Sequence, residues 1–401
     1  MFAPSGPARA DGDLYVRLGW AGGDKSGRDW ENALPGIQAA WDKIPSAGTF
    51  NIFIEKTVGG RAYGPVAGRD KRWYWANLVL NHFGGLTPAG KRFQVHRRGD
   101  ISRVVATRDW AFKVTKHCGV GRYSARAMEV RFRNMQIEGG PNCGAVLFEH
   151  IGTQARCALF ADNVTFVSGP GNRRPAVVFG AGLPPQLEVG FRRVVVRGGN
   201  GGLELSTTAR STTGAGPTRV RLTNTAFVNT GAYGLYARSQ GHPSGSFNLD
   251  VELDQVTFVG VGVAVWLGPT GRGRNRLVSS RSLYVPGDRG RGLLFRNDDN
   301  RPLEVTGSGN AAYQYKSFFR RGGRVEVSQF ATVAADPNGD PGLMCDPADL
   351  RRDRIGLTPF SDPRLIDASE QGAAEFDAQG SPRPQGMGWD TGADELEARP
   401  I

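Results

Sequence analysis

Apolar and polar residues alternate in an eight-residue segment that recurs six times in the middle of the chain. Each copy contains two short apolar runs joined by a polar residue at its fifth position. The copies are VRFRNMQI (130–137), LFADNVTF (159–166), VGFRRVVV (189–196), VRLTNTAF (220–227), VELDQVTF (251–258) and LVSSRSLY (277–284). Alternation with a period of two is typical of β-strands. Each copy therefore predicts two strands that meet at a one-residue hinge.

The hinge positions recur with a nearly constant spacing along the chain. They are Asn134, Asn163, Arg193, Asn224, Gln255 and Arg281, at intervals of 29, 30, 31, 31 and 26 residues. A period in this range indicates stacked units, none of which buries its apolar face alone. Asn tolerates the left-handed backbone conformation better than most residues. We therefore expect a left-handed residue at each hinge.

A third apolar segment follows each copy and aligns with its counterparts. These segments are AVLFE (145–149), AVVFG (176–180), GLELS (202–206), GLYAR (234–238), AVWLG (264–268) and GLLFR (292–296). Three short strands per repeat, separated by turns rather than helices, predict a right-handed single-stranded parallel β-helix. A β-sandwich or a propeller is the alternative for so many short strands.

This pattern resembles the pectate-lyase-like superfamily of right-handed β-helix proteins over residues 14 to 335. The opening LYVRLGWAGGDKSGRDWENALPGIQAAWDKIPSAGTFNIFIEK is similar to the start of many secreted bacterial members. The resemblance implies an extracellular or cell-surface protein, although the N-terminus shows no apolar signal segment. The superfamily contains lyases, hydrolases, epimerases, phage tailspikes and non-catalytic proteins, so the fold alone does not select an activity.

Three regions are predicted along the chain. Residues 1–13 are expected to form a flexible tail, and residues 14–335 the solenoid. A helix over residues 29–44, with Asp29 as its N-cap, is expected to cover the open N-terminal end. Residues 336–401 are rich in Asp, Pro and Gly and are expected to form a C-terminal cap and extended tail, as the resemblance implies.

The charge and composition of the chain limit the classes of binding partner that we expect. The chain has 401 residues, 57 Gly and 24 Pro, a formal net charge of +12 and a pI near 9.9. This charge favours an anionic partner such as an acidic polysaccharide, a polyanionic surface or nucleic acid, of which nucleic acid is the least expected. Since the basic residues are mostly Arg, codon usage is an alternative explanation. No apolar run is long enough to span a membrane, and the sequence does not indicate an oligomeric state.

Cysteine and histidine residues give little sign of a metal site. The spacing of Cys118, Cys143, Cys157 and Cys345 allows one disulfide between adjacent turns. The five His residues are dispersed and no Cys-x-x-Cys pair occurs, so a zinc site is not expected.

Candidate site residues come from the outward positions of the third strand. If Val146 and its counterparts through Leu293 face the core, the next residues face solvent. They are Leu147, Val178, Glu204, Tyr236, Trp266 and Leu294, followed two positions later by Glu149, Gly180, Ser206, Arg238, Gly268 and Arg296. Successive rungs lie about 4.8 Å apart, so the aromatic residues form a row on which sugar rings could stack, beside Arg residues that bind acidic groups.

The candidate roles follow from side-chain chemistry. We assign Glu204, Arg238, His242 and Asp298 as candidate catalytic residues, and Tyr236, Trp266, Arg296, Asn297 and Asp299 as substrate-binding residues. The adjacent Asp298 and Asp299 also suggest calcium as an optional cofactor, although such a pair is also typical of a solvated turn.

Two function classes remain open. A hydrolase needs two carboxylates about 5 to 10 Å apart, whereas Glu204 and Asp298 are three coils apart. A lyase needs a base and a cation close to a uronate. An exported polysaccharide lyase or hydrolase predicts that the candidate side chains converge in an open groove. A non-catalytic surface, adhesion or scaffold protein predicts that they are scattered or paired with one another.

Overall fold

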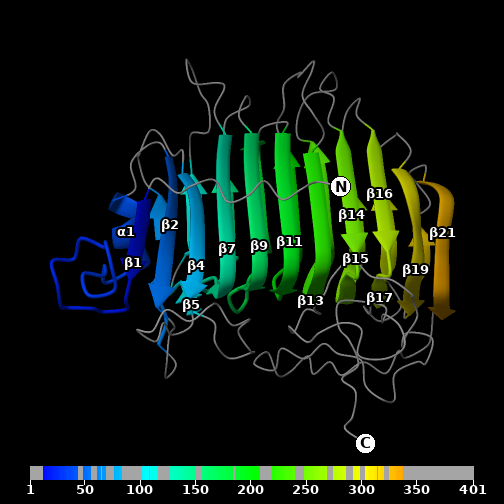
Figure 1. Cartoon of the computed structure of the whole chain (residues 1–401). Coiled ribbons are helices and arrows are strands. Elements are labelled where there is room, and N and C mark those ends of the chain that lie inside the picture. Colours follow the sequence, from blue (N-terminus) through cyan, green and yellow to red (C-terminus); the bar gives the residue numbers. More distant parts are fainter. Residues whose placement is uncertain are drawn as a thin grey trace, which may run out of the picture.

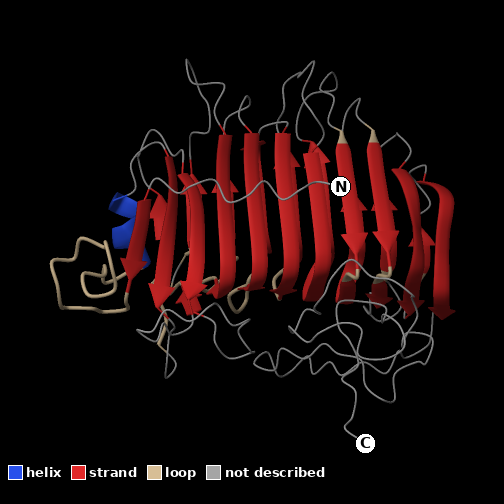
Figure 2. Ribbon diagram, in the orientation of Figure 1, coloured by secondary structure: helices blue, strands red, loops and turns tan. Residues whose placement is uncertain are grey.

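The computed structural model describes residues 12–43, 48–55, 61–64, 66–68, 76–83, 102–107, 109–115, 127–149, 156–183, 186–207, 218–239, 248–268, 274–285, 292–298, 303–313, 315–319 and 325–336. In these residues the chain forms a parallel β-solenoid with 21 strands and one short helix (Figures 1 and 2). The predicted all-β parallel solenoid is confirmed. The described residues contain no helix that is long and apolar enough to cross a membrane.

The strands form three parallel sheets, because each repeat pairs with the next in register. The first sheet contains β1 (Gly12–Val16), β2 (Gly48–Glu55), β4 (Ala76–Phe83), β7 (Ala127–Glu138), β9 (Arg156–Val167), β11 (Gln186–Arg197), β13 (Thr218–Ser239), β14 (Leu249–Asp254), β16 (Asn275–Ser280), β19 (Leu303–Tyr313) and β21 (Val325–Asp336). It extends the ladder beyond the six repeats recognised in the sequence, at both ends.

The second and third sheets use the later parts of the long strands together with shorter ones. The second contains β5 (Ser102–Val105), later parts of β7, β9, β11, β13, β19 and β21, the start of β15 (Thr257–Leu267), and β17 (Leu283–Val285). The third contains β3 (Val66–Gly68), β6 (Phe112–Thr115), β8 (Val146–Glu149), β10 (Pro175–Leu183), β12 (Gly201–Thr207), the ends of β13 and β15, β18 (Leu293–Asn297) and β20 (Ser317–Phe319).

The hinge between the first and second sheets has the predicted backbone conformation. The φ angles of Asn134, Asn163, Arg193, Asn224, Gln255 and Arg281 are 53°, 55°, 53°, 47°, 55° and 49°. A left-handed residue reverses the side on which the next side chain points, so the chain turns a corner without a longer loop. Adjacent hinges are close enough to bond, since Asn163 Nδ2 donates to Asn134 Oδ1 at 2.9 Å.

The core consists of columns of equivalent apolar side chains, which parallel pairing places on adjacent rungs. Phe227 stacks on Phe258 with ring centroids 5.0 Å apart and planes inclined by 5°, and Phe258 stacks on Tyr284 at 5.3 Å and 8°. All three rings are fully buried. Such aromatic pairs contribute about 0.5–1.5 kcal/mol each beyond the burial of their area. The stacks therefore help to fix the register between rungs.

The last recognised repeat pairs two residues away from its expected register. Val265 pairs with Phe295, not Leu293, and Trp266 pairs with Arg296. The corner position before the first inward residue is Ala or Gly in the earlier repeats, and the sequence pattern assigned Gly292 to it. In the structure Leu294 takes this corner, where it is fully buried in the main core. The prediction that Leu294 faces solvent is therefore wrong.

The helix is shorter than predicted. Helix α1 (Ile37–Lys43) lies beside β1 at one end of the stack (Figure 1), and its Ile37, Ala40 and Trp41 are buried in the main core. Asp29 is not its N-cap, because Asp29 Oδ1 instead accepts a hydrogen bond from the backbone N–H of Asn32 at 2.8 Å. Leu34, which was expected inside the helix, instead bridges to Val16 as extended chain.

The described residues include only parts of the two chain ends and only some of the cysteines. Strand β1 begins at Gly12, inside the predicted tail, and residues 1–11 and 337–401 lie outside the described part. Cys143 is a half-buried free thiol, and burial raises its pKa above the usual value. Cys118, Cys345 and the side chain of Cys157 lie outside the described part, so a disulfide that involves them stays a prediction.

Candidate functional site

Four of the predicted site residues form one column on the outer face of the third sheet, and Arg238 lies on the same face two positions further along β13. Glu204 pairs with Tyr236, Tyr236 with Trp266, and Trp266 with Arg296 on adjacent strands β12, β13, β15 and β18. Because strands alternate their side chains between the two faces, this ladder forms one continuous outward column. The register shift in β18 is decisive here, since it moves Arg296 into the column that contains the aromatic residues.

Trp266, Arg296 and Asp298 form a compact polar and aromatic unit. The guanidinium carbon of Arg296 lies 3.8 Å from the centroid of the Trp266 ring, a cation–π contact. Arg296 Nε and Nη2 donate to the two carboxylate oxygens of Asp298 at 2.9 and 2.8 Å, and Trp266 Nε1 donates to Asp298 Oδ2 at 2.9 Å. Asp298 therefore holds both the guanidinium and the indole in fixed orientations.

Glu204 has its own partners at the other end of the column. Tyr233 Oη donates to Glu204 Oε2 at 2.7 Å, and Arg238 Nη2 lies 3.4 Å from Glu204 Oε1. Burial, followed by the nearby Glu204 carboxylate, raises the pKa of Tyr233 far above its usual value. The phenol therefore stays protonated and acts as a hydrogen-bond donor to Glu204.

The aromatic rings pack against one another rather than standing apart. Tyr236 and Trp266 have centroids 4.7 Å apart at 43°, and Tyr233 meets Tyr236 at 5.1 Å and 48°. Tyr233 also makes an edge contact with Trp266 at 6.0 Å and 80°. Burial raises the pKa of Tyr236 as well. The stack from Tyr233 to Arg296 is thus preorganised, which lowers the conformational entropy lost when a ligand binds.

Tyr233 was not recognised from the sequence. It lies at the corner before the third sheet, where strand alternation does not assign a direction. A clue is Gly201, since a Cβ there would lie only 2.3 Å from the Tyr233 ring. At Gly268, between Arg238 and the end of β18, a Cβ would lie 3.1 Å from Tyr236 Oη and 2.9 Å from Arg238 Cβ. Both glycines make room for site side chains.

The remaining predicted residues are placed differently or not described. Asn297 is 1 % exposed and follows the inward column of β18, so it does not reach the outer surface. The assignment of Asn297 as a substrate-binding residue is therefore not retained. His242 and Asp299 lie outside the described residues. Leu147, in the same outward column, is nevertheless only 3 % exposed.

The carboxylates are paired within the site rather than facing each other. Glu204 lies on the first strand of the column and Asp298 directly follows the fourth, so their rungs are about 14 Å apart at about 4.8 Å per rung. That separation exceeds the range in which two carboxylates act on one glycosidic bond. Within the described residues, no three His, Cys, Asp or Glu side chains come together as a metal site, so calcium stays a prediction.

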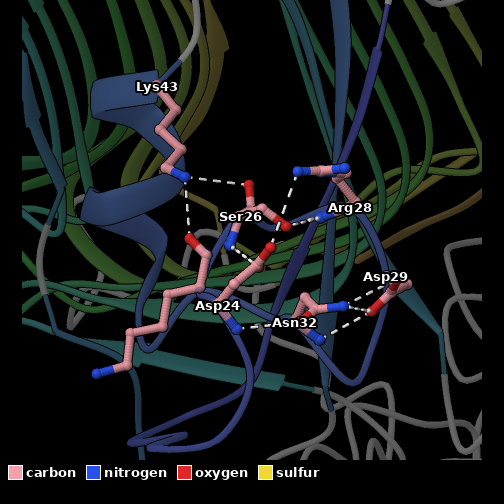
Figure 3. Close-up of polar contacts among 7 residues, drawn as sticks. Asp24, Ser26, Arg28, Asp29, Asn32 and Lys43 are labelled. Atoms are coloured by element: carbon pink, nitrogen blue, oxygen red, sulfur yellow. Dashed lines mark hydrogen bonds and ion pairs between the residues drawn. The ribbon is translucent and has the colours of Figure 1, made fainter.

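A second polar cluster occurs in the loop between β1 and α1 (Figure 3). Lys43 Nζ donates to the carbonyl oxygens of Lys25 and Ser26 at 2.9 and 3.1 Å, and Asp24 Oδ1 accepts from the Ser26 N–H at 2.7 Å. Asn32 Oδ1 accepts from the Asp24 N–H at 3.0 Å. Hydrogen bonds from Ser26 hold the pKa of Asp24 below its usual value. These contacts tie the loop to α1, so we interpret the cluster as structural.

No family model matches this sequence, and no curated protein or solved structure shows significant similarity to it. The repeat pattern, the geometry and the charges of the chain are therefore the observations that bear on its function.

Proposed function

We propose that this chain is a non-catalytic, right-handed β-helix protein that binds an acidic polysaccharide along the outer face of the third sheet. The pectate-lyase-like resemblance, the role of α1 as an N-terminal cap and an extracellular or cell-surface location are parts of the same proposal. The observation that carries it is the stack of Tyr236, Trp266 and Arg296 on three successive strands.

The chemistry of this stack suits an anionic sugar chain. The aromatic side chains offer apolar edges and polar tips. Arg296 has five N–H donors, and two of them, on Nε and Nη2, donate to Asp298. The remaining donors of a guanidinium suit a second carboxylate or sulfate. The net charge of +12 supports the attraction of a polyanion toward the protein.

The pairing of the carboxylates favours binding over cleavage. Glu204 is hydrogen-bonded to Tyr233 and faces Arg238, and Asp298 is held by Arg296 and Trp266. A carboxylate that acts as a general base must lie within hydrogen-bond reach of the proton that it removes. In this arrangement each carboxylate instead positions neighbouring protein side chains. The expected glycan is therefore bound and left intact.

Affinity electrophoresis in gels containing polygalacturonate, alginate, a sulfated glycosaminoglycan or neutral xylan tests this function. We expect retardation in an anionic gel but not in xylan, and a loss of about tenfold or more in affinity for W266A and R296Q, since charge-assisted hydrogen bonds contribute about 1.5–3 kcal/mol. R221Q is the matched control, because Arg221 is also ion-paired, to Glu252 at 2.8 Å, but lies on the first sheet.

A scaffold that binds no glycan is the second candidate. It is favoured by the fact that Arg296 covers one face of the Trp266 ring and Tyr236 packs on the same indole. If no anionic glycan retards the protein, or if W266A and R221Q behave alike, the scaffold replaces the binding function. Release of unsaturated or reducing products by the wild-type protein would instead show that the third-sheet face is catalytic.

A further inference from the structure

Three arginines surround one carboxylate at the corner where the first sheet turns into the second. Asp162 on β9 pairs with Arg133 on β7 and with Arg192 on β11, three adjacent strands (Figure 1). Arg192 Nη2 and Arg193 Nη2 donate to the two carboxylate oxygens of Asp162 at 2.5 and 2.7 Å. These four residues form the corner cluster. Three guanidinium groups and one carboxylate give it a net charge of +2.

A second corner of the same kind shows which of these contacts the solenoid itself uses. Arg281 Nη2 donates to Asp254 Oδ1, as Arg193 Nη2 donates to Asp162 Oδ1. In both pairs a hinge arginine contacts the aspartate that directly precedes the hinge of the preceding coil. The pair of Arg193 and Asp162 is therefore a structural contact of the corner.

The neighbours of the two aspartates differ between the corners. Asp254 pairs with Thr223 on one adjacent strand and with Ser280 on the other. At the equivalent positions beside Asp162 the chain has Arg133 and Arg192. Because the corner at Asp254 forms with two neutral neighbours, the fold does not need a cation at either position. Arg133 and Arg192 thus add positive charge that the corner does not require.

The charge around Arg133 is not balanced by the cluster itself. Among the described residues, no hydrogen bond or ion pair engages the exposed Arg133 side chain. Burial lowers the pKa of Arg133; the Asp162 carboxylate opposes this shift, while the like charges of Arg131 and Arg192 add to it. Like charges held close together destabilise one another. A bound anion would relieve this repulsion.

We propose that Arg133 and Arg192 form an anion-binding site for a tetrahedral dianion, namely a phosphate or sulfate group. The site lies on the first sheet and is separate from the proposed glycan-binding face of the third sheet. Arg133 and Arg192 lie two rungs apart, about 10 Å at about 4.8 Å per rung, so two long side chains can reach one anion between them.

The chemistry of the corner cluster suits this ligand. A guanidinium group binds a phosphate or sulfate through two parallel N–H donors. Both residues that donate to Asp162 belong to β11, so its carboxylate is neutralised from that side, and Arg133 approaches the anion from β7. The Arg192 side chain is 63 % exposed and therefore accessible to a ligand. The net charge of +2 equals the charge that a dianion would neutralise.

Thermal unfolding of the full chain at constant ionic strength tests the site. Inorganic phosphate and inorganic sulfate are titrated in a chloride buffer, with acetate as the singly charged reference. We expect the wild-type midpoint to rise with phosphate or sulfate until it saturates, because a ligand of the folded state stabilises it, and to stay unchanged with acetate. The stronger of phosphate and sulfate at neutral pH identifies which group the site takes.

The variant R133T gives position 133 the residue found at its counterpart, Thr223. It should need at least about tenfold more anion for the same shift. Without anion its midpoint should equal or exceed that of wild type, since a like charge has been removed. R221Q is the matched control, because Arg221 lies on the same sheet in its own ion pair with Glu252. It should keep the wild-type response to anion.

A change of pH tests the requirement for two charges. A phosphate group loses one of its charges below a pH of about 6, whereas sulfate keeps both. The response to phosphate should therefore weaken at a pH of about 5, while the response to sulfate stays.

Three results would overturn the proposal. They are a wild-type midpoint that does not saturate with either dianion, an equal rise with acetate, and a loss of response in R221Q as large as in R133T. If R133T does not fold, R133K serves instead. It keeps the charge but loses the paired N–H donors, so a weaker response to anion than in wild type is required.

Discussion

Replacement of Asp298 by Asn separates the binding function from a catalytic one. In the structure Asp298 accepts two hydrogen bonds from Arg296 and one from Trp266, beside the proposed ligand path. A ligand carboxylate on the opposite edge of the guanidinium would repel the Asp298 carboxylate. If Asp298 only positions its neighbours, D298N should therefore strengthen the binding of an acidic glycan. A catalytic Asp298 would instead make the same substitution abolish turnover.

The size of this effect follows from the geometry. With each carboxylate about 3 Å from the guanidinium nitrogens, the two anions lie about 7 Å apart. Their repulsion is about 0.6 kcal/mol in water and about 2.4 kcal/mol at an effective dielectric constant of about 20. Since the Asp298 side chain is 32 % exposed, the lower part of this range applies. We expect affinity to rise about threefold to tenfold, with less than about 1 kcal/mol change in unfolding free energy.

Titration of the glycan against D298N at two salt concentrations measures the effect. The matched control is E252Q, which removes the same charge from an ion pair of similar length, Arg221 Nε to Glu252 Oε2 at 2.8 Å, on another sheet. The gain should shrink at high salt because screening weakens the repulsion. Weaker binding by D298N, or a gain equal to that of E252Q, would refute the reasoning.

Three further predictions concern stability. D162N should lower the unfolding free energy by about 1–3 kcal/mol at neutral pH. Burial favours the protonated Asp162, but the stronger effect of Arg192 and Arg193 holds the pKa of its carboxyl below the usual value. The stabilisation is therefore present above the unfolded-state pKa near 4 and is lost as pH falls through the folded-state pKa. The urea midpoints of D162N and wild type should therefore converge in acid. Midpoints that stay apart in acid would contradict this prediction. Q255N should raise the thermal midpoint, because Asn suits the left-handed hinge and, among the described residues, neither amide atom of the buried Gln255 has a partner; an unchanged or lower midpoint in calorimetry would contradict it. F258A should cost about 3–5 kcal/mol because it opens a cavity within the stacked core column, whereas a cost below about 1 kcal/mol in urea unfolding would show that the column collapses to fill the space.

The sequence was sufficient for the solenoid and for its hinges. The period near 30 residues and the Asn at three hinge positions predicted the left-handed corners that all six residues adopt. These features are local, since a corner needs one tolerant residue and a strand needs only alternation. The helix was predicted with the wrong start because Asp29 and Asn32 bond within a turn, an alternative that spacing does not distinguish from an N-cap.

The candidate site was predicted only in part. Alternation identified Glu204, Tyr236 and Trp266 as outward residues, since the side on which a residue lies depends on parity within its own strand. It did not show that Tyr233 reaches Glu204, because that contact crosses a corner and needs the space left by Gly201.

Sequence alone thus determined which residues repeat, turn and point outward. Tertiary structure decided which rung each strand joins, as the two-residue shift that places Arg296 beside Trp266 shows. It also decided that the candidate carboxylates pair with arginines. The physical reason is that alternation depends on neighbours along the chain, whereas register depends on turn lengths, corner volumes and ladder hydrogen bonds between residues about 30 positions apart.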